Sequence, residues 1–170
     1  MLTILLMAPQ LPDNVGAIAR LMKNFGLNDL RVIAPQCSLA DPKAIAVAAG
    51  ADDILREAMH YETIEHAIHD LDALWATCGN ERDGIKPYSA PEVAMREVVT
   101  YNKPGILFGP ERTGLSNDII ARCKAVIQIP THPDFSSLNI AQSLAVIAYA
   151  WFQQQGTPRP QQHLRTGETR

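Results

Sequence analysis

Three segments of the chain combine glycine or other small residues with polar side chains that can bind or activate a substrate. They comprise residues 77–82, 108–116 and 129–139. Each follows a short apolar run typical of a buried strand, and ligands of α/β sheets collect at the carboxyl ends of strands. Small residues in such loops let backbone groups approach a ligand closely. The residue types therefore predict a ligand site built from these three loops.

The sequence lacks the common nucleotide-binding and hydrolase fingerprints. It has no G-x-G-x-x-G loop, no Walker lysine loop and no G-x-S-x-G nucleophile elbow. Each candidate segment also has a purely structural interpretation. Gly109-Pro110 is a turn signal, and Ser116 could cap the helix after it. Ser136 or Ser137 could cap the last helix, but three such loops in one small domain favour a site.

Histidines raise the separate question of a metal site. His66 and His69 are three residues apart and could share a helix face, with His60, Glu62 and Glu65 nearby. Spacing fixes no third ligand, and the segment has the pattern of an amphipathic surface helix. We therefore expect no metal.

The elements that must position the three loops alternate between strand and helix patterns. The expected strands are residues 3–8, 30–34, 71–77, 105–108 and 125–129. The expected helices are residues 14–25, 42–50, 63–70, 91–101, 117–123 and 138–155. This alternation predicts an α/β domain, a parallel sheet with helices on both faces. We expect the domain to span residues 1–155, and residues 156–170 to be a polar tail, disordered or the start of a linker.

The first and last helices carry further signals. Pro12-Asp13-Asn14 offers capping chemistry at the start of the first helix, and Gly26 ends it. The last helix is apolar on two sides, so it is either buried in the core or shared with a partner subunit. One stripe comprises Leu138, Ala141, Ala145, Ala148 and Phe152, and the other comprises Leu144, Ile147 and Trp151. If both stripes are exposed in a monomer, this helix and the first one build a dimer interface.

Length and composition fit one globular domain. The 170 residues are 46% hydrophobic and 19% charged. A net charge of −3 gives no global nucleic-acid signature, although it does not exclude a local basic patch. Cys37, Cys78 and Cys123 are too few and too far apart for a disulfide framework or a cysteine-rich zinc site. The apolar run at residues 2–8 is too short for a membrane span and lacks signal-peptide features, so we expect a cytoplasmic protein.

Three sequence blocks resemble the motifs of a known enzyme family. They are N-V-G-A-I-A-R at residues 14–20, F-G-P-E-R-T-G-L at residues 108–115, and I-P followed by F-S-S-L-N within residues 129–139. In order and spacing they resemble the motifs of the TrmH-type SPOUT RNA 2'-O-methyltransferases, and the resemblance extends to about residue 155. The continuation L-M-K-N-F-G-L at residues 21–27 is most similar to the TrmJ subgroup, which methylates a ribose in the tRNA anticodon loop.

The resemblance implies a fold, a cofactor and partners. The SPOUT fold has a C-terminal trefoil knot made by the last two motif loops and the final helix, which general connection rules would not predict. The implied cofactor is S-adenosyl-L-methionine, and the implied substrate is tRNA, at a cytidine or uridine. The implied assembly is a homodimer, with no membrane and no metal.

The resemblance also assigns catalytic roles. Arg20 would hold a backbone phosphate or the developing alkoxide, because an arginine side chain keeps its proton in proteins and makes a poor base. Asn14 and Asn139 would orient Arg20 and the ribose. Glu111 would fix its loop or the surroundings of Arg20, and Ser137 would contact cofactor and substrate. The expected cofactor-binding residues are Thr77, Cys78, Gly79, Gly109, Ile129, Ser136, Ser137 and Leu138.

Four basic residues are the expected RNA contacts. They are Arg20, Lys23, Arg82 and Arg112. In a dimer Arg20 would lie near the partner's cofactor loops, and two subunits would pool these charges. Asn80 stands where the TrmJ subgroup usually has a further arginine, which puts its exact RNA contacts in doubt.

Three alternative functions are also open. The chain could be a non-catalytic RNA-binding homologue, although the complete set of motif side chains argues against that. It could methylate ribosomal RNA by the same chemistry. It could also be an unrelated nucleotide-binding α/β enzyme. Methyl transfer to tRNA and to ribosomal RNA, measured side by side, separates all three.

Overall fold

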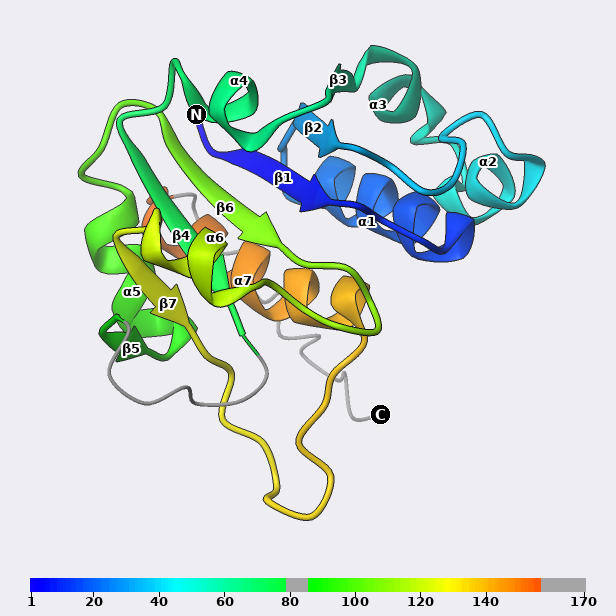
Figure 1. Ribbon diagram of the computed structural model, residues 1–170. Coiled ribbons are helices and arrows are strands. Elements are labelled where there is room, and N and C mark those ends of the chain that lie inside the picture. Colours follow the sequence, from blue (N-terminus) through cyan, green and yellow to red (C-terminus); the bar gives the residue numbers. More distant parts are fainter. Residues whose placement is uncertain (79–85, 157–170) are drawn as a thin grey trace, which may run out of the picture.

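The fold is known from a computed structural model that describes residues 1–78 and 86–156. In this part of the chain a seven-stranded sheet has the order β3-β2-β1-β6-β4-β7-β5 (Figure 1). Its strands are β1 (Thr3–Met7), β2 (Asp29–Ile33), β3 (Met59–Tyr61), β4 (Ala73–Thr77), β5 (Tyr88–Ser89), β6 (Pro104–Phe108) and β7 (Ala125–Ile127). Every strand pair is parallel, which confirms the predicted sheet.

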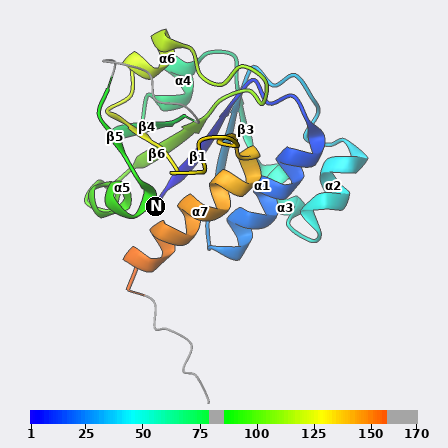
Figure 2. The same cartoon turned by 90° about the horizontal axis from the view of Figure 1, so that it is seen from below.

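Helices cover both faces of the sheet, as predicted (Figure 2). One layer holds α1 (Pro12–Asn24), α2 (Pro42–Ala48), α3 (Asp52–Glu57), α5 (Pro91–Val98) and α7 (Ile140–Gln154). The other holds α4 (Ile64–Ile68) and α6 (Asn117–Ala121). In the described ranges no helix is long and apolar enough to cross a bilayer.

The central strands are apolar on both faces because helices cover both. In β1, Ile4 and Leu6 belong to the core under the five-helix layer, whereas Leu5 belongs to the core under α4 and α6. Such strands read as continuous apolar runs instead of alternating patterns. For this reason the central strands are readily predicted from the sequence.

Helix α1 packs against α2 at a glycine. A Cβ atom at Gly16 would lie 2.2 Å from the carbonyl oxygen of Ala44, so only glycine permits this approach. Real Cβ atoms essentially never come so close to backbone. Gly16 therefore fixes α1, including Asn14 in its first turn, relative to the body of the domain.

The ends of α1 and α7 differ from the capping predictions. Helix α1 begins at Pro12, within the predicted capping segment, but its N-cap is Leu11, which makes no side-chain cap bond. Proline at the first helical position is itself a start signal. Neither Ser136 nor Ser137 caps α7: Asn139 does, as half of a capping box with Gln142. Ser116 does cap α6, accepting from the Ile119 N–H at 3.3 Å.

Three short elements were not predicted. Strands β3 and β5 form the two edges of the sheet, and α3 covers only part of one face. Strand β3 is largely exposed, so its residues carry no continuous apolar run. Elements with so little burial leave too weak a hydrophobic pattern to be recognised.

The apolar surface of α7 is not the one predicted. Leu144 and Ile147 are buried inside the chain itself, so the second stripe belongs to the core and leaves no free face. The exposed apolar side chains of the helix are instead Val146 and Tyr149, at 43% and 56% exposure. Tyr149 also makes an edge contact with Phe25 just after α1.

A buried arginine joins β2 to the end of α4. Arg31 donates to both carboxylate oxygens of Asp70, at 2.5 and 3.0 Å, and to the Ala67 carbonyl at 2.8 Å. It also donates to Asp29. These hydrogen bonds from Arg31 lower the pKa of Asp70 from 3.8 to about 2. The network pairs a charge that would otherwise be costly to bury.

Candidate active site

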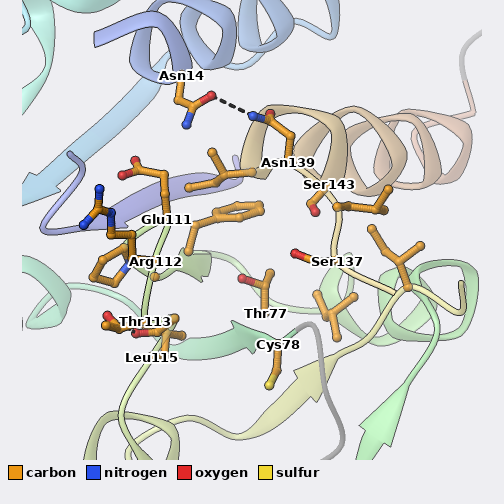
Figure 3. A pocket seen from close by; sticks show the side chains of 18 of the residues that line it. Asn14, Thr77, Cys78, Glu111, Arg112, Thr113, Leu115, Ser137, Asn139 and Ser143 are labelled. Carbon is orange, nitrogen blue, oxygen red and sulfur yellow. Dashed lines mark hydrogen bonds between the residues drawn. The ribbon is translucent and has the colours of Figure 1, made fainter. Parts of the chain in front are cut away.

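A cavity of about 420 Å³ lies at the carboxyl ends of β4, β6 and β7, beside the first turns of α1 and α7 (Figure 3). This volume is within the range of small-molecule sites. It is lined by Leu11, Asn14, Thr77, Cys78, Phe108, Gly109, Pro110, Glu111, Arg112, Thr113, Gly114, Leu115, Ile127, Ile129, Ser136, Ser137, Leu138, Asn139, Ile140, Ser143 and Ile147. Residues from all three predicted loops meet there.

The sheet order explains why these loops meet. Strand β6 lies between β1 and β4, and β7 lies on the other side of β4. Because all these strands are parallel, the loops after them emerge at the same edge. Thr77, the last residue of β4, donates its hydroxyl to the Leu107 carbonyl of β6 at 3.0 Å, which joins the ends of the two strands.

Gly109 begins a loop that folds back on itself. A Cβ atom at Gly109 would lie 2.5 Å from the backbone nitrogen of Leu115. The Gly114 N–H donates to the Pro110 carbonyl at 2.9 Å, and Gly114 has a φ of +63°. Two glycines are thus needed to bring backbone groups to the cavity wall.

An asparagine pair joins the first and third blocks. The Nδ2 of Asn139 donates to the Oδ1 of Asn14 at 2.9 Å (Figure 3). The Oδ1 of Asn139 accepts from the Ala141 N–H at 2.8 Å, which caps α7. The pair therefore holds the starts of α1 and α7 together at the cavity.

Glu111 joins the second block to the first. Its two carboxylate oxygens accept from the Gln10 N–H at 3.1 and 2.8 Å. Gln10 lies in the loop between β1 and α1, where Ala8 has a φ of +45°. Glu111 thus holds the loop between β1 and α1, a contact that was not predicted for it. Burial, with a smaller contribution from Glu111, raises the pKa of Cys37.

Most of the predicted site residues line the cavity. They are Asn14, Thr77, Cys78, Gly109, Glu111, Arg112, Ile129, Ser136, Ser137, Leu138 and Asn139. Figure 3 shows Glu111 and Arg112 on one side and Ser137 and Ser143 on the other. Gly79, Asn80 and Arg82, like residues 157–170 of the predicted tail, lie outside the described residues.

Two predicted residues are not brought to the cavity. Arg20 and Lys23 lie on the exposed face of α1, and neither lines the cavity. Lys23 pairs with Asp53 at 3.0 Å, so its charge is partly neutralised within the chain. Arg20 follows Asn14 by six positions, so their side chains point about 120° apart around the helix axis. Asn14 therefore cannot orient Arg20 of the same chain.

Several lining residues were missed in the sequence. Ser143 contributes a hydroxyl from α7, one turn after Asn139, and Leu11 contributes an apolar side chain just before α1. The spacing of four residues from Asn139 could have identified Ser143.

The cavity can hold a ligand that is partly apolar and partly polar. Leu115, Ile129 and Leu138 offer apolar contacts, while serine hydroxyls and backbone groups offer hydrogen bonds. Among the residues that the structure describes, no three His, Cys, Asp or Glu side chains are grouped so that they could hold a metal ion.

Comparison with known proteins gives consistent matches. Residues 1–149 match the model of the SpoU rRNA Methylase family. The chain is 36% identical to tRNA (cytidine-2'-O-)-methyltransferase TrmJ of Methanocaldococcus jannaschii over 154 residues, which cover 88% of this chain and 66% of that protein. It is 33% identical to tRNA (cytidine/uridine/adenosine-2'-O-)-methyltransferase TrmJ of Pseudomonas aeruginosa, over 86% of this chain and 60% of that one.

A solved structure is also similar. The crystal structure of TrmJ from Z. mobilis ZM4 superposes with a TM-score of 0.86 and is 40% identical, over 94% of this chain and 72% of that one. The chain spans somewhat less than two thirds of the length of the M. jannaschii and P. aeruginosa relatives.

Proposed function

This chain belongs to the SpoU rRNA Methylase family, and from that membership we propose that it is an S-adenosylmethionine-dependent RNA methyltransferase acting on a ribose 2'-hydroxyl. The proposed target is a cytidine or uridine in the anticodon loop of tRNA, in the cytoplasm. The names of the M. jannaschii and P. aeruginosa relatives, both tRNA 2'-O-methyltransferases, support this substrate. The observation that carries the proposal is the meeting of all three motif blocks at one cavity.

The cavity fits S-adenosylmethionine. The tight backbone at Gly109, which has no space for a side chain, suits a ligand held by main-chain groups. Ile129 and Leu138 would pack against the adenine, and Thr77, Cys78 and Ser136 would contribute backbone contacts. Ser137 would lie between cofactor and substrate. The cofactor, when bound, supplies a methyl group activated by a positively charged sulfur.

Methyl transfer to a hydroxyl is an in-line displacement, so positioning the two reactants supplies much of the rate. The 2'-oxygen must also give up its proton, to a base or to solvent water, as it attacks. Arg20 would stabilise the developing negative charge or hold the adjacent phosphate. The Asn14–Asn139 pair and Glu111 would act as positioning residues, because each fixes one loop or helix end at the cavity.

The exposed position of Arg20 supports a composite site in a homodimer. Arg20 lies outside the cavity of its own chain, so it would act at the cavity of a second copy. Leu11, Val146 and Tyr149 are exposed apolar side chains on or next to α1 and α7 that a partner would bury.

We also propose that the chain is knotted. Strand β6 lies between β1 and β4, and β7 lies between β4 and β5, although both follow β5 in the sequence. In a knotted chain, the last segments pass through a loop formed by earlier ones. The positions of β6 and β7 inside the sheet are consistent with such threading. The similarity to the SPOUT methyltransferases supports a trefoil made by the last two motif loops and α7.

Radiolabelled methyl transfer tests the proposed function. Purified protein is incubated with labelled S-adenosylmethionine and either tRNA or ribosomal RNA, followed by nucleoside analysis. We expect label in tRNA, as a 2'-O-methylated pyrimidine. Label in ribosomal RNA alone would favour the rival substrate, which the family's name makes the second candidate. Cofactor binding without transfer to either RNA would indicate a non-catalytic homologue.

A further inference from the structure

The loop between β7 and α7 carries the most exposed large apolar side chain of the described residues. Phe135 is 86% exposed. In Figure 1 this loop extends well away from the sheet and the helices. An exposed aromatic ring forgoes the favourable free energy of burial, so a ring in this position suggests a contact made with a binding partner.

The loop holds Phe135 in a defined turn. The Thr131 hydroxyl donates to the Ser136 carbonyl at 2.8 Å, closing the loop on both sides of Phe135. The Phe135 N–H donates to the His132 carbonyl at 3.0 Å, and the Asp134 N–H donates to Nδ1 of His132 at 3.1 Å. A ring presented on an ordered turn loses less entropy on binding than one on a mobile segment.

Phe135 is also adjacent to the cavity in the sequence. Ser136 and Ser137, the next two residues, line the cavity, whereas Phe135 does not. A partner that places one group in the cavity would therefore bring its neighbouring groups to Phe135.

We propose that Phe135 is a stacking platform for an unpaired nucleobase next to the nucleotide whose ribose is methylated. The inference rests on the proposed RNA methyltransferase function and adds a substrate-binding residue to it. Proteins recognise single-stranded RNA loops by stacking splayed bases on aromatic rings, and any base can stack because each has a π-face.

The immediate surroundings of Phe135 argue against a second copy of the chain as its partner. His132 and Asp134, on the same turn, are exposed and polar. The centre of a dimer interface is instead depleted of charged residues and largely apolar. A lone aromatic ring among polar groups suits a base, whose edge remains in contact with water.

Three variants at this position test the proposal. Binding of an anticodon stem-loop RNA and of an unmodified tRNA transcript is measured for wild type, Phe135→Ala, Phe135→Leu and Phe135→Tyr. Stacking on one aromatic ring is worth about 1–3 kcal/mol, so we expect Phe135→Ala to bind roughly 5- to 150-fold more weakly. Phe135→Tyr should bind like wild type, and Phe135→Leu, apolar but without a π-face, should bind like the alanine variant.

Control measurements separate stacking from other causes. Met59→Ala removes an exposed apolar side chain from the edge strand β3 and should leave RNA binding unchanged. S-adenosylhomocysteine should bind wild type and the three Phe135 variants with equal affinity in calorimetry. The dependence of affinity on salt should keep its slope in Phe135→Ala, whereas Arg112→Ala should lower that slope by about one.

The outcomes distinguish this inference from the function on which it rests. Unchanged RNA binding by Phe135→Ala, with wild type active, overturns the role of Phe135 and leaves the methyltransferase in place. Loss of dimer in sedimentation of Phe135→Ala also overturns it, because the ring would then contact a second copy. A wild-type protein that binds neither RNA overturns both the proposed function and this inference.

Discussion

Asn139 donates a side-chain hydrogen bond to Asn14 at 2.9 Å while its own oxygen caps helix α7. This bond between residues 125 positions apart in the sequence thus joins the starts of two helices. Asn14 is buried in the first turn of α1, whereas Asn139 is exposed, so the bond lies at the boundary between the core and the cavity. Both side chains line the cavity, and the same bond contributes to stability and to the shape of the site.

A double-mutant cycle measures this bond. Asn139→Ala should destabilise the protein by about 2 kcal/mol, since it removes a helix cap and a hydrogen bond, each worth roughly 1 kcal/mol. Asn14→Ala should cost only about 1 kcal/mol, and the double variant should be no worse than Asn139→Ala alone. Urea unfolding gives the free energies. Fully additive losses would show that the two side chains do not interact.

The close packing of α1 on α2 makes a second prediction. Gly16→Ala should destabilise the protein by about 1–3 kcal/mol, because the added Cβ would overlap the Ala44 carbonyl oxygen. Adding Ala44→Gly should not restore stability, since the obstacle is backbone and remains. Thermal unfolding of the single and double variants checks this, and rescue by the second change would show that the side chain of Ala44 was the obstacle.

The Arg31–Asp70 pair predicts a dependence of stability on pH. The folded-state pKa of Asp70, about 2, lies below its ordinary 3.8. The pair therefore contributes fully above pH 3.8, and its contribution is lost as the pH falls towards 2. It is worth at most about 2 kcal/mol, and less after solvent screening because 31% of the Asp70 side chain is exposed.

Asp70→Asn tests this linkage by urea unfolding across the acid range. The variant should be less stable than wild type at pH 7, and the difference should shrink between about pH 4 and 2. Asp52→Asn is a suitable control, since Asp52 pairs with Arg56 on the exposed surface of α3. A stability difference that stays constant over the acid range would mean that Asp70 acts by packing alone.

The central part of the fold was predictable because burial leaves a pattern in the sequence. Strands such as β1 and β6 are buried on both faces, and their apolar runs define them. The edge strands β3 and β5 are short and only partly buried, so their residues show no comparable pattern. The order of strands, with β6 placed between β1 and β4, depends on contacts between distant segments that periodicity does not encode.

The candidate site was predictable to a similar extent. Loops after parallel strands meet at one edge, so residue types alone indicated the cavity that Gly109 and Ser137 line. The hydrogen bond between Asn14 and Asn139 was not predictable. An asparagine at the start of α1 could equally cap that helix, so its residue type does not identify its partner. Leu144 and Ile147 were wrongly placed at a dimer interface, since an apolar stripe does not show which neighbour buries it.

Arg20→Ala should lower methyl transfer by roughly 100-fold or more, the scale of losing one key electrostatic or acid–base group. Cofactor affinity should remain near that of wild type, because Arg20 is expected to act on the RNA and is not one of the expected cofactor-binding residues. Arg56→Ala, which removes another exposed arginine, serves as the control. Turnover assays and calorimetry with S-adenosylhomocysteine measure the two effects. Near-normal turnover of Arg20→Ala would remove this residue from the mechanism.

Mixing two inactive variants tests whether Arg20 acts at the cavity of a second copy. Ser137→Ala impairs the cavity and Arg20→Ala removes the arginine, so each homodimer should be nearly inactive. If Arg20 acts across the interface, each mixed dimer has one site with both residues intact. Subunit exchange in equal amounts should then restore roughly a quarter of wild-type activity, because half of the dimers are mixed and each has one working site.

The same mixture gives the opposite result if Arg20 serves its own chain. Each site of a mixed dimer would then lack either Arg20 or Ser137, and activity would stay at the level of the single variants. Sedimentation at micromolar concentration must first show a dimer, since an active monomer would exclude a composite site directly. We expect restoration, because α1 presents Arg20 on its exposed face and away from the cavity that its own chain builds.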